Sequence, residues 1–541
     1  MAINAENKLE TKEAKSLINI SPQDSDPQNS KFTNSKFRKY LDYVFPIEKA
    51  ELPKFLNLTL LMFCILGIQN LIRAKKDSII TTMVGAETIS FLKLWGVLPA
   101  SFLVTIIYVK LVNVMRGENI FYLIMGSFLG FFAIFAFLIY PNYQYLHLSQ
   151  ETANSLIEAY PHAKWFILLL SSWSFSLFYI IAELWPTAIF ALLFWQFVNK
   201  ITTVEESKRF YPIFGLLGQT GLVASGYFLK YLKDMSHYVL NKFELHIAYD
   251  QKIALHIVSV QILLSVVLIL GIIALIAFWL INHKILDVAT AENLRFQVKK
   301  KQLTLKESFK MIVSSKYIRL IAILLVCYGF AINIAEGPWK SQVSKVYSNQ
   351  TEYDAFVGGY IAKTGIITII LVIVCSNIVR RVGWFAAAII TPIIVIVTGL
   401  SYFLVANFDV VAALAMFSFS FSDPMLMAIS LGAIQNILSK SSKYTLFDST
   451  KEMSYVPLGL ELKNRGKAAA DMIGTKLGKS TGAFVQSMIF IIIPSATFAS
   501  ISVYLMAIFT FVCLIWIWGV YELNKEYKEA CSHRKGDETI I

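Results

Sequence analysis

Charged residues stand where the first long apolar stretch of the chain ends. Residues 55–69 are almost entirely apolar, and the eight residues after them include Arg73, Lys75, Lys76 and Asp77. Helical spacing places Arg73, Lys76 and Asp77 on one side of a helix. A charge inside a membrane costs about 3 kcal/mol, so it is retained where it faces water or binds an opposite charge. The pattern indicates either an anion-binding site or lysines that extend to the membrane surface.

The second half of the chain contains a counterpart to this stretch. The segment 333–340 closes another apolar stretch and carries Glu336 and Lys340. It begins 263 residues after residue 70 (70 to 333), which is close to half the length of the chain. The repetition favours a shared central site over two separate anchoring segments.

Further ionisable residues lie within apolar segments or at their ends. They are Lys93, Glu183, Glu336, Lys363, Asp423, Asp471, Lys476 and Lys479 within segments, and Lys76 and Lys340 at their ends. A lysine can bind phosphate oxygens as a point charge, and a carboxylate can hold such lysines apart or carry a proton. Permanent ion pairs between helices are the alternative for any single residue, but the whole set favours a binding site for an anion.

The sequence contains no arrangement suited to covalent or metal chemistry. We find no nucleophile–base pair, the seven histidines are scattered, and the five cysteines have no paired spacing. The segment 474–480 imitates a nucleotide-binding P-loop, but only three residues separate its glycines, and no strand precedes it. We therefore expect a protein that is not an enzyme and has no cofactor or metal.

The composition is that of a membrane protein. Of 541 residues, 56% are hydrophobic and 16% are charged, and there are 40 Phe, 25 Tyr and 10 Trp. Such a composition suits a lipid-facing surface with aromatic belts. The net charge of +13 could suggest a nucleic-acid partner. The cations gather in loops on one predicted side, however, so positive-inside topology explains them and no nucleic acid is expected.

Apolar segments long enough to cross a membrane can be counted directly. A hydrocarbon layer of about 30 Å needs about 20 residues per helix. On this measure the sequence predicts twelve spans: 55–72, 91–112, 120–140, 165–198, 210–231, 254–281, 317–336, 356–379, 382–407, 410–438, 468–493 and 497–520. The fourth is long enough for two helices, and we prefer one helix kinked near Pro186 because it gives six plus six.

The placement of charged loops predicts the topology and the domain organisation. Basic loops fall on one side, which predicts an even number of spans with both termini in the cytoplasm. We predict a cytoplasmic tail (1–52), a six-helix bundle (53–282), a basic cytoplasmic linker with a surface helix (283–316), a second bundle (317–522) and a C-terminal cytoplasmic tail (523–541). The N-terminal tail lacks the apolar core of a signal peptide and is too acidic for a transit peptide.

The two predicted halves share local patterns. The triplet Ser-Phe-Ser occurs at 174–176 in the fourth span and at 418–420 in the tenth. Glycines recur at 215–226 in the fifth span and at 474–482 in the eleventh, where small residues allow helices to approach closely. The predicted fold is an all-α membrane protein with twelve transmembrane helices in two pseudo-symmetric six-helix halves. This is the architecture of a major-facilitator-like secondary transporter.

Several motifs together resemble one family of transporters. They are 72–77 (IRAKKD), 91–99 (FLKLWGVLP), 176–179 with 182–185, 208–212, 336–340 (EGPWK), 446–448 with 451–453, and 466–469 with 477–480. On these residues, spread over about 53–521, the chain resembles the nucleotide transporters also called ATP/ADP translocases. That family is known from plastids and from obligate intracellular bacteria such as chlamydiae and rickettsiae.

The resemblance implies a carrier that moves nucleotides by alternating access, either by exchange or by proton-coupled import. Four charged positions tied to transport in that family match Lys76, Glu183, Glu336 and Lys479. We expect Lys76 and Lys479, helped by Arg73 or Lys340, to bind phosphates. Glu183 and Glu336 are expected to balance these lysines in the empty site.

Substrate and coupling remain open at this point. The expected partners are ATP, ADP, GTP or UTP, the lipid bilayer, and a proton if import is coupled to it, with the carrier a monomer in a bacterial inner membrane. A strict ATP/ADP antiporter is the alternative, and a transporter of another organic phosphate is more distant. Gln219 and Thr220 replace the usual Ala-Asn after Gly218, which makes strict exchange less secure. The acidic N-terminal tail favours an intracellular bacterium over a plastid.

Overall fold

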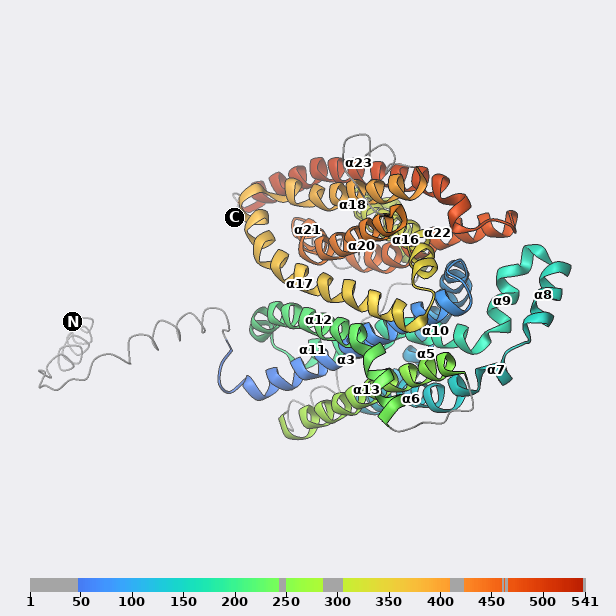
Figure 1. Cartoon of the computed structure of the whole chain (residues 1–541). Coiled ribbons are helices and arrows are strands. Elements are labelled where there is room, and N and C mark those ends of the chain that lie inside the picture. The colour runs from blue at the N-terminus through green and yellow to red at the C-terminus, as the bar shows by residue number, and fades with distance from the viewer. Residues whose placement is uncertain are drawn as a thin grey trace, which may run out of the picture. The chain divides into compact units, whose positions relative to one another are not determined.

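A computed structural model of the chain describes residues 47–242, 250–285, 305–408, 423–459, 462 and 466–538 (Figure 1). The chain divides into two units, Met1–Glu51 and Leu52–Ile541. Of the first unit only residues 47–51 are described, and there the Glu51 N–H donates to the Glu48 carbonyl oxygen at 3.0 Å. The second unit contains all the helices described below.

The first half of this second unit begins with the long helix α3 (Leu52–Met83). It continues with α4 (Thr88–Phe91), η2 (Leu92–Val97), α5 (Leu98–Val114), α6 (Gly117–Ile134), η3 (Phe135–Ile139), α8 (Gln150–Ala159), α9 (Lys164–Ser171), α10 (Trp173–Trp185), η6 (Pro186–Phe194), α11 (Trp195–Ile201), α12 (Val204–Lys242), α13 (Gln251–Leu280) and η7 (Ile281–Ile285). The segments η2, η3, η6 and η7 are π-helical turns that continue the α-helices beside them.

The second half repeats this pattern of long helices. It comprises α15 (Leu305–Ser314), α16 (Lys316–Val346), α17 (Gln350–Val382), α18 (Trp384–Asn407), α20 (Pro424–Ser442), the π-helical η8 (Lys443–Phe447), α21 (Asp448–Ser454), α22 (Lys467–Ile492) and α23 (Phe498–Glu538). Side chains cap several of these helices. Asn349 accepts from the Thr351 N–H at the start of α17, and Asp423 accepts from the Met425 N–H at the start of α20.

Ten helices in the described part of the chain are long and apolar enough to cross a membrane. They match ten of the twelve predicted spans, whereas the tenth and eleventh are not confirmed at full length. The predicted tenth span begins in 409–422, outside the described residues, and α20 supplies its end. For the eleventh, α22 has the shorter apolar part Leu477–Ile492 among the described residues. The fourth span, predicted as one helix over 165–198, is interrupted at Ser172, which separates α9 from the membrane-length helix Trp173–Ile201. Pro186 starts a π-helical turn within that helix.

The segments between the spans are partly helical. The predicted loop 141–162 contains α8, in which the Ser149 side chain accepts from the Thr152 N–H. Of the predicted linker 283–316, the structure describes the short helix α15, and residues 286–304 lie outside the described residues. One connection therefore joins the two sets of helices, and its described part includes the short helix α15.

The repeated glycines predicted close helix packing, and the structure shows that they bring the first and fifth helices of each half together. A Cβ added at Gly218 of α12 would meet Leu66 of α3 at 3.0 Å, and one at Gly478 of α22 would meet the Val326 carbonyl oxygen of α16 at 2.8 Å. Across the halves, α12 packs extensively on α17 (Figure 1). There the backbones of Gly226 and Ala362 touch, which leaves no room for a Cβ at Gly226.

Candidate functional site

A polar cavity of about 60 Å³ lies between the two halves. Helices α3 and α12 line it from the first half, and α16, α17, α20 and η8 line it from the second. Its volume has room for only a few water molecules. Charged side chains from both halves occupy the space around it, so a larger anion can enter only where these side chains part.

On the first half, Lys76 of α3 is held by two carboxylates. Its Nζ lies 2.7 Å from Asp77 Oδ1 and 3.0 Å from Glu183 Oε2 on α10. The same ammonium group sits 3.9 Å from the centre of the Tyr179 ring. The Lys76 side chain is only 2% exposed. An almost fully buried cation is therefore balanced by two anions and one aromatic face.

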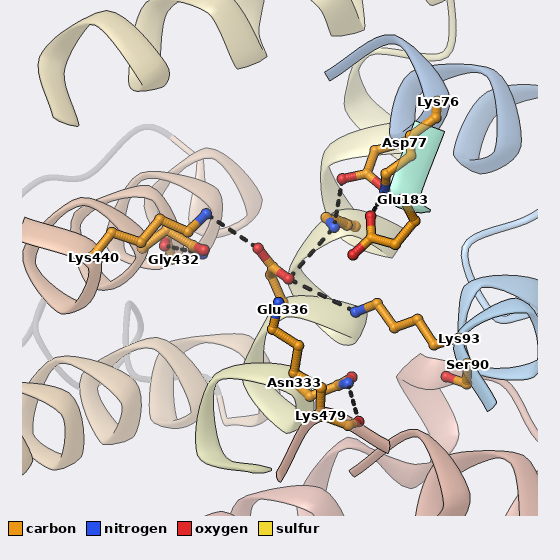
Figure 2. A network of polar contacts seen from close by, with 12 residues as sticks. Lys76, Asp77, Ser90, Lys93, Glu183, Asn333, Glu336, Gly432, Lys440 and Lys479 are labelled. Carbon is orange, nitrogen blue, oxygen red and sulfur yellow. Dashed lines mark hydrogen bonds and ion pairs between the residues drawn. The ribbon is translucent and has the colours of Figure 1, made fainter. Parts of the chain in front are cut away.

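Asp77 and Glu336 extend this cluster into the second half (Figure 2). Lys340 of α16 lies 2.9 Å from Asp77 Oδ2 and 3.5 Å from Glu336 Oε2. In Figure 2, Lys440 and Lys93 reach Glu336 from opposite sides. Their distances to its carboxylate are 3.2 and 3.9 Å. Glu336 thus collects three lysines, and the Asp77–Lys340 pair joins the two counterpart segments that the sequence singled out.

Arg73 and Lys479 differ from these lysines because they form no ion pair within 4.0 Å among the described residues. Each lies within electrostatic range of both Glu183 and Glu336. The Lys479 side chain is exposed, and the two carboxylates in its electrostatic range, Glu183 and Glu336, come from the two halves. Asn333 Nδ2 donates to the Lys479 carbonyl oxygen at 2.7 Å and fixes the backbone there. These two cations are the ones available to a new anion.

All six residues predicted to bind substrate therefore belong to one neighbourhood. Lys76, Glu183, Glu336 and Lys340 are ion-paired there, and Arg73 and Lys479 are not. Sequence reasoning missed Lys440, which was placed at the start of a cytoplasmic loop because the predicted tenth span ended at residue 438. Helix α20 extends to Ser442 and carries Lys440 into the site. Its aromatic neighbour Tyr360, 5.3 Å away, could not be inferred from spacing.

A second missed pair lies beside the cavity. Lys75 Nζ is 2.6 Å from Asp354 Oδ2 on α17 and 3.0 Å from Ser259 Oγ on α13. Both charged side chains are 0% exposed. Asp354 follows the start of α17 closely, so its sequence position suggested an ordinary helix-end residue. The pair joins α3 to α17 and so connects the halves.

Other charges in the predicted spans have local roles. Asp423 caps α20, and Asp471 lies 3.1 Å from Lys451 on α21. Lys363 is exposed on α17 and does not line the cavity. The side chain of Lys476 lies outside the described residues. The charges of Asp423 and Asp471 are therefore explained by a helix cap and an ion pair, and not by a role in the central site.

Polar contacts between the halves gather where α3 ends and α17 begins, which we call the sealed end. There Ser78 Oγ donates to the Gln350 carbonyl oxygen at 3.3 Å, and Tyr140 Oη donates to Gln350 Oε1 at 2.9 Å. Across the same end, Ser90 Oγ donates to Gln486 Oε1 at 2.7 Å. These contacts and the Lys75–Asp354 pair close one end of the space between the halves.

Several site residues lie in or next to π-helical turns, where the chain departs from regular α-helix. Lys93 lies in the π-helical η2, Glu183 precedes the π-helical η6, and Tyr444 lies in the π-helical η8. Such turns are frequent at functional sites because they rotate side chains away from the regular helical positions. Pro338 lies inside α16 between Glu336 and Lys340, and because proline has no N–H, the Ile334 carbonyl oxygen loses its helical donor there.

The site carries an excess of positive charge. Apart from the Lys443–Asp448 pair, which adds no net charge, the charged residues of this neighbourhood among the described side chains are Arg73, Lys76, Lys93, Lys340, Lys440 and Lys479 on one hand and Asp77, Glu183 and Glu336 on the other. Six cations and three carboxylates give a net formal charge of +3. This excess suits an anion with several negative charges, such as a chain of phosphates.

Comparison with known proteins adds a family to this geometry. A family model described as TLC ATP/ADP transporter matches residues 30–527. The chain is 63% identical over 497 residues to ADP,ATP carrier protein 4 of Rickettsia bellii, covering 92% of this chain and 94% of that protein. It is 60% identical to ADP,ATP carrier protein 4 of Rickettsia conorii, covering 95% and 99%. With ADP,ATP carrier protein 3 of Rickettsia bellii the identity is 45%, with coverage of 92% and 98%.

Solved structures resemble the fold at low sequence identity. The nucleoside transporter NupG superposes with a TM-score of 0.52 and 12% identity, covering 87% of this chain and 99% of that one. A D-xylose-proton symporter gives a TM-score of 0.52 with 11% identity, covering 87% and 97%. These likenesses support the predicted transporter fold in two halves, and at such identities they show the fold alone.

Proposed function

Because the chain belongs to the TLC ATP/ADP transporter family, we propose that it moves nucleotides across a bacterial membrane by alternating access, exchanging one nucleotide for another. The single observation that carries this proposal is the net formal charge of +3 on the nine charged residues of the neighbourhood between the halves, with Arg73 and Lys479 left unpaired among the described residues. A nucleoside di- or triphosphate carries roughly three or four negative charges, so it can neutralise the site.

The same charge supports exchange over proton-coupled import. Moving an uncompensated charge through a low-dielectric barrier is costly, so the empty carrier reorients slowly. Bound polyphosphate removes that cost, and a return step then requires a second nucleotide. Proton coupling would need a carboxylate free to take up a proton, whereas Asp77, Glu183 and Glu336 are each ion-paired with lysine.

The residues divide the work of binding. Arg73 and Lys479 contact the phosphates first, because no ion pair must break to release them. Lys76 and Lys340 turn to the substrate when phosphate oxygens replace Asp77 as their partner. Glu183 and Glu336 hold the lysines in place while the site is empty, which limits their mutual repulsion.

In the membrane, we place both chain termini in the cytoplasm, in line with the basic loops on that side. The sealed end then faces away from the cytoplasm, and the cavity is reached from the cytoplasmic side. This orientation assigns the conformation described here to an inward-facing carrier.

The experiment is uptake of labelled nucleotide into vesicles that contain the purified protein. We expect uptake of labelled ATP, GTP, CTP or UTP to require unlabelled nucleotide inside and to persist with a protonophore. Lys363→Ala is a matched control, since that lysine is exposed and outside the cavity. Uptake into vesicles without internal nucleotide, abolished by the protonophore, would replace exchange by proton symport. Absence of uptake and of binding for every nucleotide would refute the proposed substrate class.

A further inference from the structure

The central cavity has two chemically different ends along α3. The residues of α3 that line it include Gln69, Asn70, Arg73 and Asp77, which lie on one face of the helix. From residue 69 to residue 77 the helix rises by about 12 Å. The carboxylates and lysines that line the cavity are linked to the Asp77 end of this face. Lys340 pairs with Asp77 and Glu336, and Lys440 pairs with Glu336. The Gln69 side is neutral.

Uncharged residues from three further elements complete the neutral end. Leu222 of α12, Ile361 and Thr364 of α17, and Tyr444 of η8 are uncharged and also line the cavity. Thr364 Oγ1 donates its hydrogen to the Tyr360 carbonyl oxygen at 2.8 Å, so toward a ligand this hydroxyl can act only as a hydrogen-bond acceptor. Aliphatic groups, one aromatic ring and two carboxamides are suited to a flat heterocycle with polar edges and not to phosphate.

Gln69 provides the sharpest sign of a ligand at this end. Its Oε1 is buried, and no donor within the described part of the chain reaches it. A buried acceptor without a partner costs about 1–3 kcal/mol, so a protein retains one where something else supplies the donor. Gln69 lines the cavity, which brings this oxygen next to the space that a substrate would occupy.

Tyr444 is an exposed aromatic ring of the cavity: Lys443 Nζ lies 4.8 Å from the ring centre on one face, so stacking would use the other face. Of the other large rings of the cavity, Trp339 and Tyr353 are each 1% exposed, and the half-buried Tyr360 ring packs against Trp339 at 5.3 Å with Lys440 Nζ 5.3 Å from its centre. Tyr444 is 42% exposed. It also lies in electrostatic range of Arg73, which places the ring beside one of the two unpaired cations.

We propose that the neutral end of the cavity, with Gln69 and Tyr444, is the nucleobase subsite of the carrier. The Tyr444 ring stacks on the base, and the Gln69 carboxamide forms a hydrogen bond to the polar edge that distinguishes one base from another. The phosphates point toward Arg73 and the lysines. This inference rests on the proposed function and deepens it, since it assigns the residue that ranks the bases.

The test separates base from phosphate by using tripolyphosphate as a probe without a base. Inhibition constants of ATP, GTP, CTP, UTP and tripolyphosphate are measured against uptake of one labelled nucleotide. Gln69→Met keeps the side-chain length but removes both hydrogen-bonding groups. We expect this variant to change the ratio between the inhibition constants of the best and the worst nucleotide by about tenfold, because a hydrogen bond to the base edge discriminates between bases. The constant for tripolyphosphate should change less than about twofold, since no phosphate contact is lost.

Tyr444→Leu is the second variant, and its exposed position makes it tolerant of substitution. All four nucleotides should bind about tenfold more weakly, while tripolyphosphate is unaffected, because stacking does not depend on base identity. Tyr504→Leu, at a 69% exposed ring of α23 outside the cavity, is its matched control.

The outcomes distinguish the subsite from the function. If either variant weakens tripolyphosphate as much as nucleotides, or if Gln69→Met and Tyr444→Leu leave all five constants unchanged, the subsite is overturned and the transporter proposal stands. If the unaltered protein binds nucleotides no better than tripolyphosphate, the subsite alone is overturned. If it neither takes up nor binds any nucleotide, the proposed function fails, and the subsite fails with it.

Discussion

Lys479 is the residue at which phosphate binding can be tested most directly. It forms no ion pair within the described residues, so Lys479→Ala removes a substrate contact without freeing a buried carboxylate. A hydrogen bond to a charged group contributes about 1.5–3 kcal/mol, so we expect every nucleotide to bind roughly 10- to 100-fold more weakly. Competition binding with four nucleotides and tripolyphosphate measures this.

The pattern across ligands decides this prediction. A contact to phosphate must weaken all five ligands by a similar factor, because each carries the same group. Loss confined to one base would assign Lys479 to the base and contradict the role proposed for it. Lys363→Ala, at an exposed lysine outside the cavity, should leave all five affinities unchanged.

At the residue scale, charge within apolar segments could be recognised from the sequence, but partners could not. Glu183 and Glu336 stood out because an unpaired carboxylate is costly in a membrane. Lys440 and Asp354 did not stand out. Lys440 lies just past the predicted end of the tenth span, and Asp354 lies near the start of α17, and charged residues are common at helix ends. Only the packing of α3 against α17 and of α16 against α20 brings them to buried partners. Pairing of this kind depends on tertiary contacts, which spacing along one helix does not contain.

At the element scale, the contact of α12 with α17 offers a test with a control one residue away. A Cβ on Gly358 would lie 2.5 Å from the Lys230 backbone nitrogen and 2.6 Å from the Gly226 carbonyl oxygen, whereas a Cβ on Gly359 meets nothing within 4 Å. Overpacking costs about 1–3 kcal/mol, and this contact joins the halves. We expect Gly358→Ala to lower the melting temperature of the purified carrier and its uptake rate, with Gly359→Ala unchanged. Equal behaviour of the two variants would show that the backbones separate easily.

The helices themselves were predictable because each span is a run of apolar residues that can be recognised without knowing what it packs against. Their irregularities were less so. Pro186, where a kink was predicted, is the point at which the fourth span changes from α-helix to π-helix, but the π-helical turns at η2 and η8 follow no proline and leave no such mark. The glycines of α12 and α22 predicted close packing, and the structure pairs them with α3 and α16. That Gly226 contacts α17 of the other half could not be inferred, since the same pattern serves contacts within and between halves.

At the scale of the whole molecule, the sealed end and the charged cavity act on the same equilibrium. The Lys75–Asp354 pair stabilises the sealed conformation, because opening that end exposes or separates two charges that are 0% exposed here. Removing one partner of such a pair costs about 3–5 kcal/mol. The net charge around the cavity opposes movement of the empty carrier. The two effects together keep the unloaded protein sealed at this end.

A reporter cysteine tests this coupling. Ser78 is 0% exposed at the sealed end, and the native cysteines are buried apart from Cys531, which is partly exposed. In a Cys531→Ser background, Ser78→Cys should react slowly with a membrane-impermeant maleimide in vesicles without nucleotide. Adding a transported nucleotide neutralises the cavity and allows the sealed end to open. We expect the labelling rate to rise about tenfold, which corresponds to a shift of about 1.4 kcal/mol in the equilibrium.

Asp354→Asn provides the positive control, because it breaks the pair and should make Ser78→Cys reactive with no nucleotide present. Sulfate at the same concentration provides the negative control, since it cannot bridge cations from both halves as a polyphosphate can. If Asp354→Asn raises labelling while nucleotide leaves it unchanged, the sealed end opens independently of the charge in the cavity. Exchange would then need another explanation, because the empty and loaded carriers would cross the same barrier.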